Sequence, residues 1–179
     1  MLHENQSVAG LGPVMQMAFV PTDFDAAVAH WTTVMGVGPF FLMEDIALTD
    51  MKCMGQSSDA VFSLALAYWG DMQIELIRPD NDSPSHLNGD YGVRDQLHHT
   101  CLLVGDIHDA YAACKKHDAT VVVEGKVGSD GAVIYADFGG GPGHVVEMLQ
   151  PQPGTQDVFD MIKQAGKDWD GKDPLRKLG

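Results

Sequence analysis

Two glutamates interrupt segments of the chain that are otherwise largely apolar. Glu75 lies within residues 72–79 and Glu147 within residues 144–151, and each stands four residues before a proline. A carboxylate inside an apolar strand costs free energy unless it is paired or bound to a metal ion. Two such residues in matching positions therefore indicate a shared chemical role, with metal binding and proton transfer as the candidates.

A second pair of polar residues begins two other apolar runs. Gln16 and His99 each start a run that ends seven residues later in an aspartate, Asp23 in the first case and Asp106 in the second. Each aspartate is a natural N-cap for the helix-like stretch that follows, because its side chain accepts bonds from unpaired backbone N–H groups. The chain thus contains an internal repeat, and the four polar residues occupy equivalent places in its two copies.

If the two copies pack about a pseudo-twofold axis, these four side chains converge. Gln16, Glu75, His99 and Glu147 then offer three oxygens and one imidazole nitrogen to a divalent metal ion. Such donors leave zinc, nickel, cobalt, manganese and iron as candidates, and the absence of thiolate argues against a structural zinc cage. The two carboxylates balance the charge of the ion, which still polarises a substrate carbonyl as a Lewis acid.

Each of these residues also has an ordinary structural interpretation. A single glutamine at a strand start is usually a surface or turn residue, and a single histidine is more often hydrogen-bonded in the core than bound to metal. The shared register of all four residues favours the metal interpretation. His98 points to the opposite face of the strand from His99, so we expect it in a second layer or at the surface; His86 has no spacing that suggests a role.

The elements that hold these residues follow from the hydrophobic pattern. After each aspartate, apolar residues recur at helical spacing, and the two helices should end near Gly36 and near residues 117–118. Strand-like segments then precede each glutamate strand: residues 40–46 and 60–68 in the first copy, 119–124 and 132–138 in the second. Each copy therefore has the order β-α-β-β-β.

These elements divide the chain into an N-terminal extension, two modules, a linker and a C-terminal tail. Their residues are 1–13 for the extension, 14–79 for the first module, 80–94 for the linker, 95–151 for the second module and 152–179 for the amphipathic tail. The tail is expected to dock on the domain or on a partner subunit.

Two further segments depart from regular elements. The first copy is longer than the second, which places an insertion within residues 48–58. The glycine run 139–143 lacks the ending of a phosphate-binding loop and precedes a strand, so it predicts a hairpin turn.

Composition and charge narrow the possible partners. The 179 residues are 45% apolar and 20% charged, and the formal net charge is −14. This charge disfavours nucleic acid and anionic membrane surfaces, because both require a basic surface. The three cysteines form no disulfide framework, and no signal peptide or membrane-spanning run is visible, so we expect a cytoplasmic protein.

The pattern as a whole resembles the vicinal oxygen chelate superfamily of glyoxalases, bleomycin-resistance proteins and extradiol dioxygenases. The likeness spans about residues 14–151 and is carried by residues 17–27 with Trp31, by residues 98–101 and by the two glutamate strands. It implies an α+β fold in which two βαβββ modules form a curled mixed sheet around a metal-centred cavity. It also implies a homodimer.

Within the superfamily, the spacing is similar to that of glyoxalase-like members near methylmalonyl-CoA epimerase and glyoxalase I. The resemblance places the four donors named above at the metal positions of the family. Two departures stand out. The strand at residues 60–68 lacks the glutamate base of the epimerase, and Val20 stands where glyoxalase I has an arginine for glutathione.

The ligand set and the resemblance together predict a divalent-metal-dependent isomerase, epimerase or lyase acting on a small organic substrate. Glu75 or Glu147 would remove a proton beside a carbonyl or enol bound to the metal, with Glu75 slightly favoured. Four aromatic residues are candidates for the wall of the substrate cavity, with core packing as the alternative for each: Phe41, Trp69, Tyr135 and Phe138. A non-catalytic, drug-sequestering protein on the same fold is the second interpretation, and the ligand set favours the enzyme.

Overall fold

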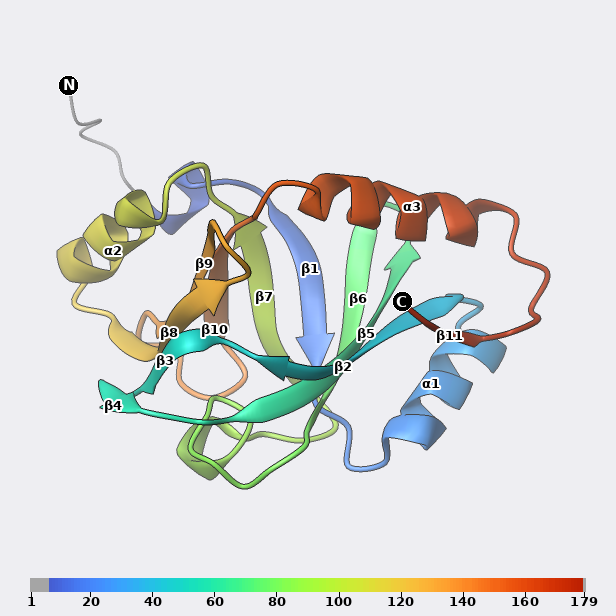
Figure 1. Ribbon diagram of the computed structural model, residues 1–179, viewed down its shortest axis with the longest axis horizontal. Helices are drawn as coiled ribbons and strands as arrows, with labels where there is room; N and C mark the ends of the chain where they lie inside the picture. The colour runs from blue at the N-terminus through green and yellow to red at the C-terminus, as the bar shows by residue number, and fades with distance from the viewer. Residues whose placement is uncertain (1–6, 179) are drawn as a thin grey trace.

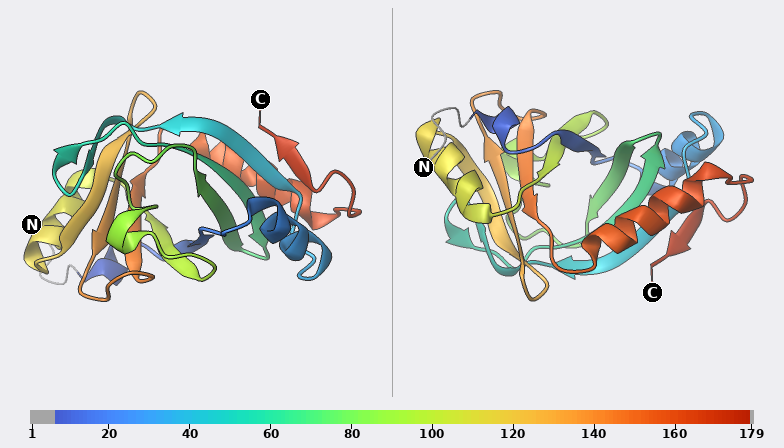
Figure 2. Two further views of the ribbon diagram at one scale, coloured as in Figure 1. Left: turned by 90° about the horizontal axis from the view of Figure 1, so that it is seen from below. Right: turned by 90° about the horizontal axis from the view of Figure 1, so that it is seen from above.

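The computed structural model describes residues 7–178, so residues 1–6 of the expected N-terminal extension and Gly179 lie outside the described part of the chain. Within it, strands form one mixed sheet in the order β11-β2-β5-β6-β1-β7-β10-β9-β8-β3-β4. Figure 1 shows α1 and α2 toward opposite ends of the long axis, and Figure 2 shows how the sheet curls between them. The expected α+β fold with a curled mixed sheet is therefore observed.

The first repeat copy forms one βαβββ module. Its elements are β1 (Val14–Phe19), α1 (Phe24–Thr33), β2 (Phe40–Ala47), β5 (Val61–Trp69) and β6 (Met72–Pro79). β6 pairs parallel with β1 and antiparallel with β5, which in turn pairs antiparallel with β2. The predicted N-cap is confirmed, because the Asp23 side chain accepts a 2.9 Å hydrogen bond from the Ala26 backbone N–H.

The second repeat copy has the same order and pairing. Its elements are β7 (Leu97–Leu103), α2 (Ile107–Lys116), β8 (Thr120–Val127), β9 (Gly131–Asp137) and β10 (Val145–Gln150). β10 pairs parallel with β7, and β1 pairs antiparallel with β7, which joins the two modules at the middle of the sheet. The second N-cap is also confirmed, since the Asp106 side chain accepts a 2.9 Å bond from the His108 backbone N–H.

The insertion in the first copy crosses to the other module. Only Leu48 separates β2 from β3 (Thr49–Cys53), and β3 pairs antiparallel with both β4 (Gln56–Ser57) and β8. One continuous stretch of chain therefore starts at one end of the curled sheet and pairs at the other end. This connection spans the open side of the curl (Figure 2).

The C-terminal tail docks on the same chain. Helix α3 (Thr155–Lys167) buries Phe159 and Ile162 against Phe41 and Leu66 of the first module, as its amphipathic pattern predicts. β11 (Leu175–Lys177) then adds to β2 at the edge of the sheet. Two short 3-10 helices complete the elements, Val8–Gly10 and Gly89–Tyr91. No helix in the described part of the chain is long and apolar enough to cross a membrane.

The strands bury side chains on both faces of the sheet. In β1, Met17 and Phe19 pack toward α1, whereas Gln16 and Ala18 face the inside of the curl. In the same way, Ile74 of β6 faces α1, while the neighbouring Glu75 faces inward. This period of two gives each central strand one outward apolar face and one inward face that carries a polar residue.

Candidate metal centre

Four adjacent strands at the middle of the sheet carry the four repeat donors. In the order β6-β1-β7-β10, the strands hold Glu75, Gln16, His99 and Glu147 respectively. Ala18 is the register partner of both Glu75 and His99, and Cys101 is the partner of both Gln16 and Glu147. The repeat therefore places the pair Glu75 and Gln16 and the pair Glu147 and His99 symmetrically about the β1–β7 junction. All four residues come from one chain.

Three of the donors meet in a buried cluster. The Nε2 atom of His99 lies 3.1 Å from Glu147 Oε2 and 3.3 Å from Glu75 Oε2. One ligand atom from each of the three residues lies within 4.8 Å of the other two. His99 is fully buried, and Glu75 and Glu147 are only 5% and 6% exposed. Carboxylates that are buried to this extent are costly unless a cation lies beside them, and both carboxylates of the cluster are directed at the same place.

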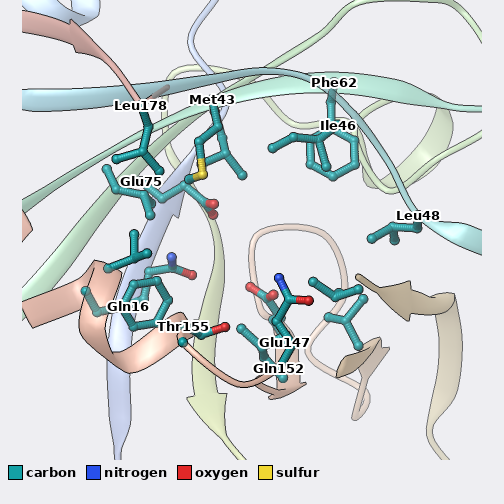
Figure 3. A pocket seen from close by; sticks show the side chains of 18 of the residues that line it. Gln16, Met43, Ile46, Leu48, Phe62, Glu75, Glu147, Gln152, Thr155 and Leu178 are labelled. Atoms are coloured by element: carbon teal, nitrogen blue, oxygen red, sulfur yellow. The ribbon is translucent and has the colours of Figure 1, made fainter. Parts of the chain in front are cut away.

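Gln16 presents an acceptor that has no hydrogen-bond partner. Its Nε2 donates a 2.7 Å hydrogen bond to Gln73 Oε1, and the Nε2 of Gln73 donates at 3.1 Å to the Tyr68 hydroxyl. This chain orients the amide, so its oxygen is the group left for a ligand. Gln16 Oε1 is buried without a hydrogen-bond partner, and so is Glu75 Oε2 apart from its ion-pair contact with His99. Gln16 also lines the same cavity as Glu75 and Glu147 (Figure 3).

Two histidines behind the cluster fix the tautomer of His99. His98 Nε2 lies 2.8 Å from the backbone oxygen of His86, which can only accept, so this nitrogen carries the proton. A neutral His98 then accepts at Nδ1, where His99 Nδ1 lies 2.9 Å away. His99 must therefore donate from Nδ1 and present its Nε2 toward the two glutamates. This is the arrangement in which a metal-binding histidine is oriented by its other ring nitrogen.

The pKa values of the cluster residues reflect how closely the two carboxylates approach the imidazole of His99. Burial disfavours a charge on His99, but the hydrogen bond to Glu147 and the attraction of both carboxylates outweigh it and raise the pKa of its imidazole to about 9. Burial raises the pKa of the Glu75 carboxyl, with the His99 contact opposing it. Burial lowers the pKa of His98 to about 3, which keeps His98 neutral, so that its Nδ1 can accept from His99.

The donor set fits a divalent metal ion. Two carboxylates, one imidazole nitrogen and one amide oxygen match the preferences of hard and borderline dications. The unpartnered Gln16 Oε1 and Glu75 Oε2 are acceptors of the kind that an ion would satisfy. Glu75, His99 and Glu147, with Gln16 beside them, are therefore the residues of this chain that could hold the metal.

The cluster lies at the wall of a cavity of about 460 Å³, a size in the range of small-molecule sites. Of the four aromatic residues expected to line it, Tyr135 does so. The structure places Phe41 beneath α3, and Phe138 among the side chains that pack against α2. Trp69 is half exposed on the outer side, where its ring contacts Trp31. The alternation of side chains along β5 explains why Trp69 faces outward, because the inward positions of this strand hold other side chains.

Sequence reasoning did not identify several residues around the site. The wall includes Phe62 and Leu64 of β5 and Val158 of α3, and His86 stacks on Tyr135 with 3.9 Å between ring centroids. The alternation within residues 60–68 could have indicated the β5 side chains. His86 carried no such signal, because it lies in a segment whose composition predicts only a loop, and its position depends on how that loop folds back.

Comparison with known proteins agrees with this geometry. A family model described as the glyoxalase/bleomycin resistance protein/dioxygenase superfamily matches residues 15–135. The chain belongs to this superfamily. Members of the superfamily typically bind a divalent metal ion, which agrees with the buried cluster of this member. No curated protein matches the chain at a significant level.

Solved structures of other proteins show the same fold. A hypothetical protein from Bacillus halodurans is 13% identical, with a TM-score of 0.53 over 79% of this chain and 95% of its own. Methylmalonyl-CoA epimerase from Mycobacterium tuberculosis is 14% identical, with a TM-score of 0.52 over 88% and 97%. A Streptomyces coelicolor methylmalonyl-CoA epimerase variant is 11% identical, with a TM-score of 0.51 over 80% and 96%. At these identities, the likeness is one of fold.

Proposed function

We propose that this superfamily member is a divalent-metal-dependent isomerase, epimerase or lyase that removes a proton beside a carbonyl or enol oxygen of a small organic substrate. The observation that carries the proposal is the buried cluster of Glu75, His99 and Glu147 at the wall of an apolar cavity. A divalent ion held by these donors would supply Lewis-acid polarisation of the substrate oxygen. The protein residues would position the substrate and move the proton.

Glu75 is the proposed general base. Glu147 Oε2 makes the cluster's hydrogen bond to His99 at 3.1 Å, whereas Glu75 Oε2 meets the same nitrogen only in a longer ion-pair contact of 3.3 Å. Both side chains line the cavity, so the less restrained carboxylate is the better placed to take a proton from the carbon next to the carbonyl. Returning that proton to another face or another carbon gives epimerisation or isomerisation. Loss of a leaving group from the neighbouring carbon gives a lyase.

The first test separates metal binding from proton transfer. We expect Glu75→Gln to retain bound metal, because the amide oxygen can still coordinate, and to lose proton exchange. The probe is 2-hydroxyacetophenone, which carries two neighbouring oxygens and exchangeable methylene protons, followed by proton NMR in deuterated water with the metal-loaded protein. Exchange should fall by about tenfold or more.

Glu124→Gln is the matched control, since Glu124 is also a strand glutamate but pairs with Lys52 and Tyr111 outside the cavity. It should leave exchange at the wild-type rate. Exchange that persists unchanged in Glu75→Gln would remove Glu75 from the role of base. Exchange that is also absent from the metal-loaded wild-type protein, together with tight retention of small apolar compounds, would favour the second function.

That second function is a non-catalytic protein that sequesters small molecules in the same cavity. The observation in its favour is the aliphatic character of most of the wall. The buried carboxylates argue for the enzyme, because a purely apolar binding site has no need of two groups that are costly to desolvate.

A further inference from the structure

The walls of the cavity define what kind of molecule it can hold. Met43, Ile46, Leu64 and Leu66 line the side formed by β2 and β5, and Val158 of α3 is also part of the wall. Apolar surface of this kind favours an apolar ligand, because binding removes apolar area of both from water. The polar groups of the site are few and concentrated at the glutamates, as is usual for small-molecule sites.

Basic side chains are missing from this wall. Among the described residues that line the cavity, none is Lys, Arg or His, and the ionisable ones are Glu75, Glu147 and Tyr135. Two lysines adjoin lining residues in the chain, but each is paired with a carboxylate: Lys126 with Asp50, and Lys177 with Glu44. Both of these neighbouring lysines are therefore already paired with an acidic side chain.

An anionic carrier would meet this site at an electrostatic cost. Phosphates and carboxylates are normally recognised by Arg or Lys side chains or by helix N-termini. Gly154 and Thr155 bring the N-terminus of α3 to this wall, but its partial positive charge is opposed by Asp157 in the first turn of the helix and by the carboxylates of Glu75 and Glu147. Coenzyme A carries several negative charges on its nucleotide, and the chain itself has a formal net charge of −14. Repulsion of this kind slows association and weakens binding, most strongly at low ionic strength.

Uncharged polar groups also line the cavity, where they could orient a substrate. Figure 3 shows Thr155 and Gln152 on the same side of the cavity as Glu147, across from Met43 and Ile46. A hydroxyl and an amide can each donate or accept a hydrogen bond with a neutral oxygen. They complement a neutral ligand without requiring a charge on it.

We propose that the substrate is an uncharged, largely apolar carbonyl or enol compound that is held within the cavity beside α3, and that acyl-coenzyme A and glutathione adducts are disfavoured. This inference rests on the proposed function and names the substrate class of the same site. The apolar portion packs on the β2 and β5 wall and on Val158, and the carbonyl end faces Glu75 and Glu147.

The test compares two probes that share one reacting group. The S-ethyl thioester of acetoacetate and acetoacetyl-coenzyme A carry the same acyl group and differ only in the neutral or polyanionic thiol part. Calorimetric titration of each into the metal-loaded chain should give a dissociation constant about ten or more times lower for the S-ethyl thioester. The gap should widen as salt is reduced. Equal or tighter binding of acetoacetyl-coenzyme A would overturn the proposal.

A pair of variants on α3 locates the binding site. Val158→Trp fills the cavity and should weaken binding of the S-ethyl thioester by about tenfold or more. Met161→Trp makes a similar change at an exposed position on the same helix and should leave the affinity unchanged. Metal affinity should be unaffected by both variants. Wild-type affinity for the S-ethyl thioester in Val158→Trp would contradict the placement of the ligand.

The two proposals fail in different ways. If the wild-type chain binds no divalent metal, the proposed function fails, whichever probe binds. If the chain binds metal but prefers acetoacetyl-coenzyme A, only the substrate class fails. A third outcome is that the protein has no metal affinity but binds the S-ethyl thioester in a way that depends on Val158. This result would support the proposed ligand class and contradict the catalytic proposal.

Discussion

The orientation of His99 depends on residues that never reach the cavity. The backbone oxygen of His86 holds His98 in the tautomer that accepts from His99, and this leaves His99 Nε2 directed at the two glutamates. Partners behind a ligand of this kind usually matter for metal affinity almost as much as the ligand does. At the residue scale, His98 is thus a positioning residue.

Removing the acceptor on His98 should weaken metal binding. We expect His98→Leu to lower the affinity for a divalent ion by about 10- to 100-fold, because His99 can then adopt the other tautomer. His98→Asn, whose side-chain oxygen can accept from His99, should recover part of the loss. Chelator competition measures both, with a thermal melt to check folding. Wild-type affinity in His98→Leu would show that the tautomer is set in another way.

The repeat made the donor residues predictable, but the residues that surround them could not be predicted in the same way. Glu75 and Glu147 stand out because charged residues in apolar strands are costly, and the matched register adds Gln16 and His99. The structure brings Glu75, His99 and Glu147 together, while their binding of a metal stays a prediction. His86 could not be predicted, because its contacts arise from a loop that has no periodic pattern.

At the scale of elements, local patterns predicted most helices and strands, whereas non-local pairing was not predictable. The capping aspartates and the alternating strands lie within short windows of sequence. The pairing of β3 with β8 and of β11 with β2 joins segments far apart in the chain. Such contacts depend on the assembled sheet, and the sequence of either segment alone does not specify its partner.

The glycine run after β9 is a turn, as expected, and one carboxylate organises it. Asp137 accepts hydrogen bonds from the backbone N–H groups of Gly139 at 2.8 Å and Gly141 at 2.9 Å, and from the Tyr91 hydroxyl at 3.0 Å. Partial burial opposes its charge, but these hydrogen bonds outweigh burial and lower the pKa of its carboxyl.

The lowered pKa predicts how this turn contributes to stability. Because the folded-state pKa lies below the unfolded value, the contribution is complete above the unfolded pKa and is lost as pH falls through the folded pKa. At neutral pH, Asp137→Asn should lower the free energy of unfolding by about 1–2 kcal/mol. The difference from wild type should shrink in acid.

Urea unfolding at several pH values measures this effect. Asp59→Asn serves as the control, since Asp59 is an exposed aspartate. A cost of Asp137→Asn that is the same at acid and neutral pH would show that the charge of the carboxylate has no part in it.

At the scale of the whole molecule, two modules and a tail combine to enclose one cavity. The modules join at β1 and β7, so the donors lie on both sides of the junction within one chain. Helix α3 packs on the inner face of the first module and contributes Thr155 and Val158 to the wall. The amphipathic pattern predicted that the tail would dock. Its place beside the cavity could not be predicted, since that depends on the curl of the complete sheet.

The proposed function depends on metal binding by the purified chain. We expect about one divalent ion per chain by elemental analysis, and added ion should raise the thermal midpoint. An ion at a hundred times its dissociation constant stabilises the folded state by about 2.7 kcal/mol. Glu147→Ala, which removes one of the two carboxylates, should reduce both signals. A wild-type chain without bound metal, and without a thermal shift on adding zinc, nickel, cobalt, manganese or iron, would contradict the account.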